Sequence, residues 1–288
     1  MSDTINTILC GVDLDDQTGA RSAIGWSHEL AVLTGAALHL LGVSTPTSAE
    51  RSPELIAEIH RDALAELTSD SPPADALTHL HTASNGLADA ARSLSRTVAP
   101  DLVVVASHDT EGITTLGLRG TAHTLAHRLD VPVAAVPHLG GPLHDGTWVV
   151  GVDGSELSSR ALAWTKAVAA ATGSRCCAVY SVDDIYDTFE THGWYGGESE
   201  SVRHSIAADP VVDLVEREGD DPAETLRAVA AEREAAAVVV AARDRGSLGG
   251  ALLGIVPDHL LHQPSGPVVV LPHAHLTRHV VEHTGTTS

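Results

Sequence analysis

Two aspartate-containing segments directly follow apolar runs of the chain. Asp13-Leu14-Asp15-Asp16 comes after residues 8–12, and Asp153-Gly154-Ser155-Glu156 comes after residues 148–152. A carboxylate at the end of a strand can accept hydrogen bonds from an exocyclic amine or a hydroxyl group of a ligand. The same aspartate or serine can instead cap the next helix by accepting bonds from its first backbone N–H groups. Both roles stay open at Asp13 and at Asp153.

Glycine begins a helical segment at two positions further along the chain. Gly120-Thr121 follows Ala106-Ser107-His108-Asp109, and Gly254-Ile255 follows Ala241-Ala242-Arg243-Asp244. Glycine lets the first backbone N–H groups of a helix approach an anion closely, and the helix dipole adds a favourable potential. The sequence therefore predicts phosphate contacts at Gly120, Thr121 and Gly254.

Common catalytic motifs do not occur in the sequence. It has no G-x-S-x-G nucleophile elbow, no G-x-x-x-x-G-K-[ST] phosphate loop and no H-E-x-x-H metal pair. We therefore predict no catalytic residue, and an enzyme is not the favoured class.

Histidine is abundant, with 18 residues, and it is concentrated near the C-terminus at His273, His275, His279 and His283. Spacing of i,i+4 on a helix can bind a metal ion, but a solvated tail is the more common outcome, so we predict no metal ligand there. Imidazoles gain charge as the pH falls, and a proton-responsive role is therefore a further hypothesis.

The segments that must position these residues occur twice, at offsets that shrink from 140 to 138 to 135 residues. The repeated pairs are residues 8–13 with 148–153, 23–26 with 161–164, 101–106 with 236–241, and 132–138 with 267–273. Such self-similarity indicates two copies of one domain.

Most of the repeated runs are rich in β-branched residues and nearly all apolar, which is typical of strands covered on both faces in a parallel sheet. Helical patterns at residues 87–94 and 223–230 each precede a buried strand. This alternation predicts an α/β fold of two tandem doubly wound domains with right-handed crossovers. Ligands of such sheets bind at the carboxyl ends of the strands where the strand order reverses, and the aspartate and glycine segments lie there.

Glycine and proline interrupt regular structure at residues 140–146, and we place the domain boundary there. The first domain is expected over residues 1–140 and the second over residues 146–275. Residues 276–288 are polar and are expected to form a frayed tail.

The two copies differ between their second and third expected strands. Residues 51–68 have the pattern of an amphipathic helix. Residues 183–209 contain Trp194-Tyr195-Gly196-Gly197 and a charged, serine-bearing stretch, and we expect a partly irregular loop there.

Charge and composition restrict the partners and the location of the protein. Thirty-eight acidic against 17 basic side chains give a formal charge of −21, which repels nucleic acid and anionic membrane surfaces. No apolar run is long enough to span a membrane, and the N-terminus has no signal-peptide pattern. The three cysteines, Cys10, Cys176 and Cys177, lie in strand-like runs without C-x-x-C spacing. We expect a cytoplasmic protein with buried, reduced thiols.

Residues 151–156 (Gly-Val-Asp-Gly-Ser-Glu), the glycine before each last helix and the closing run 267–272 resemble the universal stress protein family. The resemblance covers nearly the whole chain, twice. It implies adenine nucleotide alpha hydrolase-like domains, each with a mainly parallel five-stranded sheet and helices on both faces. A tandem pair of this length is similar to the actinobacterial type, in which the last strands of the two domains pair. That implies an intramolecular pseudo-dimer joined through residues 133–136 and 268–271, and it leaves a further homodimer open.

The resemblance also implies a stress-response protein that binds or senses ATP, with Mg²⁺ as a companion ion, and that acts through a protein partner. Asp13 and Asp153 would lie near the base or the ribose. Gly120, Thr121 and Gly254 would donate hydrogen bonds to the phosphates.

The chain departs from the ATP-binding branch of the family, which carries G-x-x-G, a spacer and then Gly-Ser or Gly-Thr. Alanine replaces the first glycine at Ala106 and Ala241, aspartate replaces the second at Asp109 and Asp244, and Ile255 lacks the hydroxyl group. Two alternatives to nucleotide sensing therefore stay open. One is a nucleotide-free interaction module that recruits partners through the segment around Trp194, and the other is a weak ATPase in which Asp109 or Asp244 holds magnesium.

Overall fold

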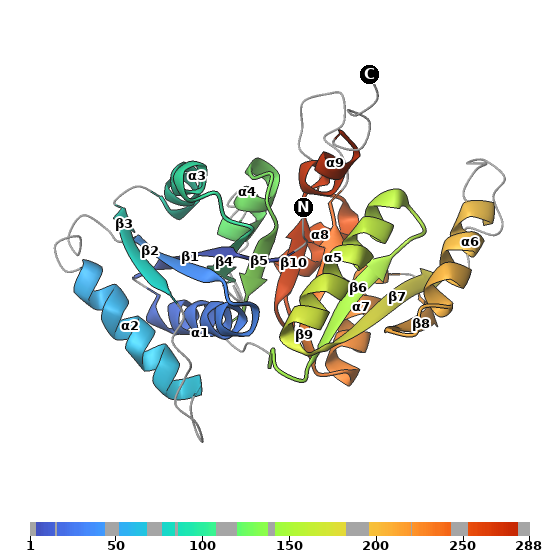
Figure 1. Cartoon of the computed structure of the whole chain (residues 1–288), viewed down its shortest axis with the longest axis horizontal. Coiled ribbons are helices and arrows are strands. Elements are labelled where there is room, and N and C mark those ends of the chain that lie inside the picture. The colour runs from blue at the N-terminus through green and yellow to red at the C-terminus, as the bar shows by residue number, and fades with distance from the viewer. Residues whose placement is uncertain are drawn as a thin grey trace.

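The computed structural model of the 288-residue chain describes most of its length. The described residues are 4–14, 16–43, 52–67, 77–83, 86–107, 120–137, 142–182, 196–219, 221–242 and 253–281. Figure 1 shows the two halves of the chain side by side along the long axis of the molecule.

Strands and helices alternate through the first half of the chain. Its elements are β1 (Thr7–Asp13), α1 (Gln17–Thr34), β2 (Ala37–Val43), α2 (Ser52–Leu67), β3 (Thr78–Ala83), α3 (Leu87–Val98), β4 (Leu102–Ala106), α4 (Thr121–Arg128) and β5 (Val133–Val136). The predicted amphipathic helix at residues 51–68 is confirmed as α2. Helix α1 ends at Gly35, whose φ of 73° is the left-handed conformation that glycine adopts without a steric cost.

The second half repeats this order and adds one C-terminal helix. Its elements are β6 (Thr147–Val152), α5 (Glu156–Thr172), β7 (Arg175–Val182), α6 (Gly196–Ala207), β8 (Val212–Glu218), α7 (Pro222–Glu232), β9 (Ala235–Ala241), α8 (Ile255–His262), β10 (Val268–Leu271) and α9 (His273–Val281). Among the helices of the described residues, none is long and apolar enough to cross a membrane.

All strands join one ten-stranded sheet with the order β3-β2-β1-β4-β5-β10-β9-β6-β7-β8. Each half is parallel and doubly wound, as the sequence predicts, and its strand order reverses between its first and fourth strands. The halves meet where β5 pairs antiparallel with β10, and this confirms the expected pairing of residues 133–136 with 268–271. In that pairing Ala134 lies opposite Val269, its own counterpart 135 residues later, so a pseudo-two-fold axis passes through this pair.

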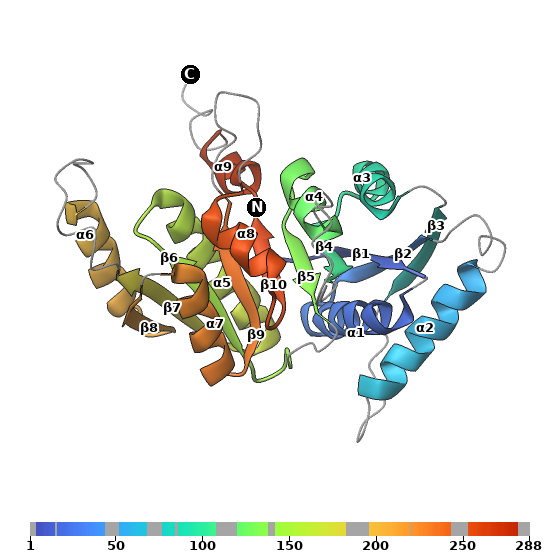
Figure 2. The same ribbon diagram turned by 180° about the vertical axis from the view of Figure 1, so that it is seen from behind.

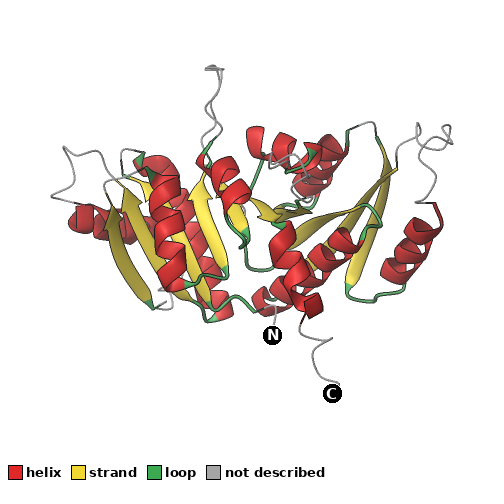
Figure 3. Ribbon diagram, turned by 90° about the horizontal axis from the view of Figure 1, so that it is seen from above, coloured by secondary structure: helices red, strands yellow, loops and turns green. Residues whose placement is uncertain are grey.

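Helices cover both faces of the sheet, and each face has its own hydrophobic core (Figures 2 and 3). One core joins α1, α2, α5, α6 and α9 to the sheet, and the other joins α3, α4, α7 and α8 to it. Neighbouring side chains of β4 and β9 point into opposite cores, and this explains their continuous apolar sequences.

Three tryptophans join the halves on the face that carries α1 and α5. The ring of Trp148 lies 6.2 Å from that of Trp26 and 6.3 Å from that of Trp164. Trp26 and Trp164 are counterparts in the repeat, and Trp148, which is fully buried, therefore packs between equivalent side chains of the two halves. These aromatic contacts therefore stabilise the packing of the two halves against each other on this face.

Two expectations about irregular segments are wrong. Residues 196–207, inside the segment expected to be a loop, form helix α6. Its burial of Ile206, which is 5% exposed, outweighs the weak helix propensity of glycine and serine in the segment. Trp194-Tyr195 lies outside the described residues.

The polar tail also begins later than predicted. Helix α9 extends to Val281 because Leu276 is buried against the core and the Arg160 guanidinium donates to its carbonyl. Residues 282–288 lie outside the described part of the chain.

Candidate functional site

A cavity of about 140 Å³ lies at the carboxyl ends of β1 and β4, where the strand order of the first half reverses. Its lining comes from β1, the N-terminal regions of α1, α3 and α4, and the end of β4. The lining residues are Asp13, Asp16, Ala20, Leu87, Ala106 and Thr121. Two of the predicted site residues, Asp13 and Thr121, are thus brought together from distant parts of the sequence.

A glycine in β1 brings helix α3 close to this cavity. A Cβ atom on Gly11 would lie 2.9 Å from Cδ1 of Leu87, closer than side chains pack. The second half repeats the device, because a Cβ atom on Gly151 would lie 3.1 Å from Cδ1 of Leu226. The repeated Gly-Val-Asp sequence therefore has a packing role as well as a place beside the cavity.

Two carboxylates, those of Asp13 and Asp16, lie beside the cavity. Asp16 caps helix α1, since its Oδ1 accepts from the backbone N–H of Gly19 at 3.2 Å. The capping role therefore applies to Asp16. Asp13 is solvent-exposed at the end of β1 and lines the cavity.

Gly120 leaves the first turn of α4 open. It is the N-cap residue of that helix and makes no side-chain cap, so no protein side chain at this position covers the first N–H groups. A Cβ atom at Gly120 would meet nothing within 4 Å. The hydroxyl of Thr121 and the N-terminal end of α4 can therefore approach an anion in the cavity.

The corresponding residues of the second half are arranged differently. Asp153 Oδ1 accepts from the N–H of Ser155 at 3.0 Å, and the Ser155 hydroxyl accepts from the N–H of Ser158 at 3.1 Å as the cap of α5. Gly254 begins α8 with φ 94° and ψ 159°, a backbone conformation restricted to glycine. Residues 243–252 lie outside the described chain, as do residues 108–119 of the first half, so Asp109 and Asp244 are not placed.

The sequence reasoning did not single out three of the lining residues. Ala20 and Leu87 supply the apolar part of the wall, and Asp16 supplies a second carboxylate. Asp16 lies in the quoted aspartate segment, but its position in the cavity depends on the start of α1. No local signal marks Leu87, because its place follows from the close approach of α3 to Gly11.

The cysteines lie away from this cavity and are unreactive by burial. All three are free and buried. Burial raises the pKa of Cys10 to about 12, that of Cys176 to about 12 and that of Cys177 to about 11. These raised pKa values disfavour a thiolate at neutral pH, and the expectation that the three thiols are buried is confirmed.

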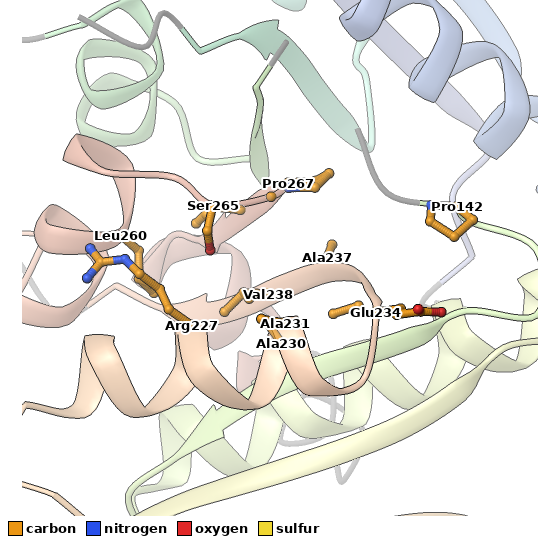
Figure 4. Close-up of a pocket in the computed structure, with 13 residues that line it drawn as sticks. Pro142, Arg227, Ala230, Ala231, Glu234, Ala237, Val238, Leu260, Ser265 and Pro267 are labelled. Atoms are coloured by element: carbon orange, nitrogen blue, oxygen red, sulfur yellow. The ribbon is translucent and has the colours of Figure 1, made fainter. Parts of the chain in front are cut away.

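A second cavity of about 190 Å³ lies beside α7 and α8, towards the amino ends of β9 and β10 (Figure 4). Arg227 is its most conspicuous polar side chain. Its guanidinium donates to Glu224 at 2.6 Å and to the carbonyl groups of His259 and Gln263 at 2.7 and 3.0 Å. These bonds satisfy the end of helix α8, so we assign Arg227 a structural role and do not place the ligand site here.

Comparisons with known proteins agree with the two-fold repeat. The model of the universal stress protein family matches residues 4–137 and again residues 147–272. A functionally unknown protein from Pseudomonas aeruginosa PAO1 superimposes with a TM-score of 0.67 and 19% identity over 99% of both chains. A universal stress protein from Archaeoglobus fulgidus DSM 4304 does so with a TM-score of 0.65 and 17% identity, over 94% of this chain and 97% of that chain. At 17–19% sequence identity, the similarity to these two structures establishes the fold alone. Curated proteins gave no match.

Proposed function

Since the chain belongs to the universal stress protein family, we propose that it is a stress-response protein that binds a magnesium–adenine nucleotide in the cavity of its first half and signals to a protein partner. The observation that carries the proposal is the meeting of Asp13 and Thr121 in one cavity at the strand-order reversal.

The lining divides into parts that suit the parts of a nucleotide. Ala20 and Leu87 offer apolar surface to a base, and Asp13 offers a carboxylate to an amine or a ribose hydroxyl group. Thr121 and the uncapped first turn of α4 offer donors to phosphates. The described walls enclose less than the roughly 300–1,000 Å³ of usual ligand pockets, and residues 108–119, which join β4 to α4, lie outside the described chain.

The charge of the cavity determines the form in which the nucleotide binds. Its described lining contains two carboxylates and no basic side chain. The two carboxylates would repel a bare polyphosphate, because like charges that lie close together repel each other. Magnesium bridges carboxylates and phosphates through oxygen ligands, so we expect the magnesium complex to be the bound form.

Isothermal titration tests the proposal, together with chromatography of any nucleotide released when the purified chain is denatured. We expect heat with Mg-ATP and little or none with ATP in EDTA. Gly120→Glu places a carboxylate at the first turn of α4 and should abolish binding. Gly120→Ala is the matched control, because a Cβ atom there meets nothing within 4 Å, and it should bind like the parent.

A nucleotide-free interaction module is the second candidate. It is favoured by the two carboxylates in the cavity and by Ala106 at a position where the ATP-binding branch has glycine. Absence of heat and of co-purified nucleotide would support this candidate against nucleotide binding. A weak ATPase stays a hypothesis on Asp109 and Asp244, and it requires hydrolysis that Asp→Asn abolishes at one of them.

A further inference from the structure

Four ionisable side chains meet between α4 and α8, on the face of the sheet opposite the tryptophans. They are His123 and His127 of α4 and Asp258 and His262 of α8. Nε2 of His123 lies 2.6 Å from Oδ1 of Asp258 and 3.2 Å from Nε2 of His127. The ring of His262 lies 5.9 Å from that of His123, and the two helices are neighbours in Figure 2. We call these four residues the interhelix cluster.

The cluster lies on the pseudo-two-fold axis of the molecule. His123 and Asp258 are 135 residues apart, and so are His127 and His262, which is the offset of the paired strands β5 and β10. The contact therefore joins equivalent positions of the two halves, one basic and one acidic.

Burial and distance describe the His123–Asp258 contact as a short hydrogen bond between a buried imidazole and a partly hydrated carboxylate. The His123 side chain is 5% exposed, whereas that of Asp258 is 43% exposed and keeps part of its hydration. A separation of 2.6 Å is at the short end for hydrogen bonds that join two charged groups. The Nε2–H of His123 donates to the carboxylate, and this carboxylate is a partner that can offset the charge when His123 is protonated.

The geometry permits one shared proton and disfavours a second. Nε2 of His123 and Nε2 of His127 lie 3.2 Å apart, so the two atoms cannot both carry a hydrogen that points at the other. While His123 donates to Asp258, His127 must present its lone pair. Protonation of His127 as well would place two positive charges side by side in a poorly solvated contact.

The distance between His123 and Asp258 does not fit a zinc ion bound by both of these atoms at the observed positions. Tetrahedral bonds of about 2.0–2.1 Å hold two ligand atoms roughly 3.3 Å apart. The 2.6 Å between His123 and Asp258 is too short for that and suits a hydrogen bond. Consistently, no arrangement of three or more candidate ligands suited to a metal ion occurs among the described residues.

Three other charged side chains on α4, α7 and α8 interact with partners outside the His123–Asp258 pair. His259 of α8 lies 3.7 Å from Asp221, and Arg128 of α4 lies 3.4 Å from Asp89 of α3. His262 lies within the cluster, with Nδ1 donating to the Asp258 carbonyl at 2.8 Å and lying 3.9 Å from its carboxylate. Arg227 of α7 donates to the end of α8 rather than to Asp258.

We propose that the interhelix cluster is a proton-operated lock between the two halves. The lock is closed while the cluster holds one proton and His123 is an imidazolium paired with Asp258. It weakens as rising pH removes that proton, because the donor loses its positive charge and the ion pair becomes a hydrogen bond from a neutral imidazole to the carboxylate.

Thermal unfolding of the full chain between pH 5.5 and 8.5 tests the lock, with His123→Gln, Asp258→Asn and the double variant. We expect Asp258→Asn to lower Tm by about 3 °C near pH 6.5 and by half of that or less at pH 8.5. His123→Gln should give the same profile, and the double variant should lose no more than either single variant. His144→Gln, which removes an exposed histidine paired with Asp145, is the matched control and should leave the profile of the parent.

A loss of Tm that is equal at every pH, or single-variant losses that add in the double variant, would overturn the proposal. So would a loss of Tm in EDTA that His123→Gln abolishes, because the cluster would then hold a metal ion. Histidine ring NMR gives a second measurement for variants that fold poorly. The His123 resonance of the parent should titrate, and Asp258→Asn should move its midpoint to lower pH; an unmoved midpoint contradicts the lock.

Discussion

The two halves of the molecule have the same strand order but place different residues at equivalent positions. Ile8 of β1 corresponds to Trp148 of β6, and only the latter joins the halves through aromatic packing. Gly120 begins α4 with φ −55°, whereas Gly254 begins α8 with φ 94°. The repeat therefore conserves the scaffold within the chain, and the differences are concentrated at the junction and at the cavity.

The largest expected difference between the halves concerns Trp148 and its counterpart Ile8. Trp148→Ala should lower the free energy of unfolding by about 3–5 kcal/mol, because it removes a fully buried ring and leaves a cavity between Trp26 and Trp164. Urea denaturation measures the loss. Trp148→Ile introduces the residue found at the equivalent position of the first half, and it should lose less free energy of unfolding than Trp148→Ala. Equal losses in the two variants would contradict the cavity explanation.

The next difference concerns the two glycines that begin α4 and α8. Gly254→Ala should cost about 1–3 kcal/mol, because its φ of 94° with ψ of 159° is essentially confined to glycine. Gly120→Ala should change stability by about 0.5 kcal/mol or less, since the backbone is ordinary and the space is open. Chemical denaturation of both variants checks this, and a costly Gly120→Ala would contradict the open first turn.

The comparison of the two halves also shows which parts of the fold can be predicted from the sequence. The buried strands, the repeat and the junction of β5 with β10 follow from apolar runs and the family resemblance. Helix α6 does not, because glycine and serine in the segment reduce local helix propensity while burial of Ile206 acts only in the tertiary structure. The interhelix cluster depends on the register at the junction, which pairs Ala134 with Val269, and no local pattern gives that register.

Candidate site residues were predictable where they follow strands and not where they depend on packing. Asp13 and Thr121 belong to segments that the α/β pattern places at the carboxyl edge of the sheet. Leu87 lines the cavity because Gly11 lets α3 approach β1, a contact between elements far apart in the chain. Whether an aspartate caps a helix or faces a ligand was open in the sequence, and the structure gives the capping role to Asp16.

The caps of α1 and α5 are expected to contribute equally to stability and to differ in their effect on nucleotide binding. Asp16→Ala and Ser155→Ala should each cost about 1 kcal/mol, since each removes the acceptor for a first-turn N–H. Asp16→Asn should retain the cap, because asparagine caps helices well, and should weaken magnesium-dependent nucleotide binding because Asp16 lines the cavity. Ser155→Ala should leave binding unchanged, and titration calorimetry separates these outcomes from stability.

The smallest expected effect is an acid sensitivity that comes from the first half. Burial, followed by repulsion from His28, lowers the pKa of His60, and burial, followed by neighbouring histidines, lowers the pKa of His39 and of His81. The unfolded chain therefore binds protons more readily than the folded chain just below the ordinary imidazole pKa of about 6.5. The folded state is therefore fully stable with respect to these histidines above that pH, and it loses stability as the pH falls towards their lowered pKa values.

His60→Gln with His81→Gln should reduce the fall of Tm between pH 7 and 5, and His144→Gln, on an exposed loop, should not. This effect has the opposite sign to that of the lock, which is lost as the pH rises, so the two can be separated in one series of melts. Adding Asp258→Asn to the double variant should lower Tm near pH 6.5. It should not change how far Tm falls between pH 7 and 5. A double variant that falls as steeply in acid as the parent would mean that the acid sensitivity does not come from these first-half histidines.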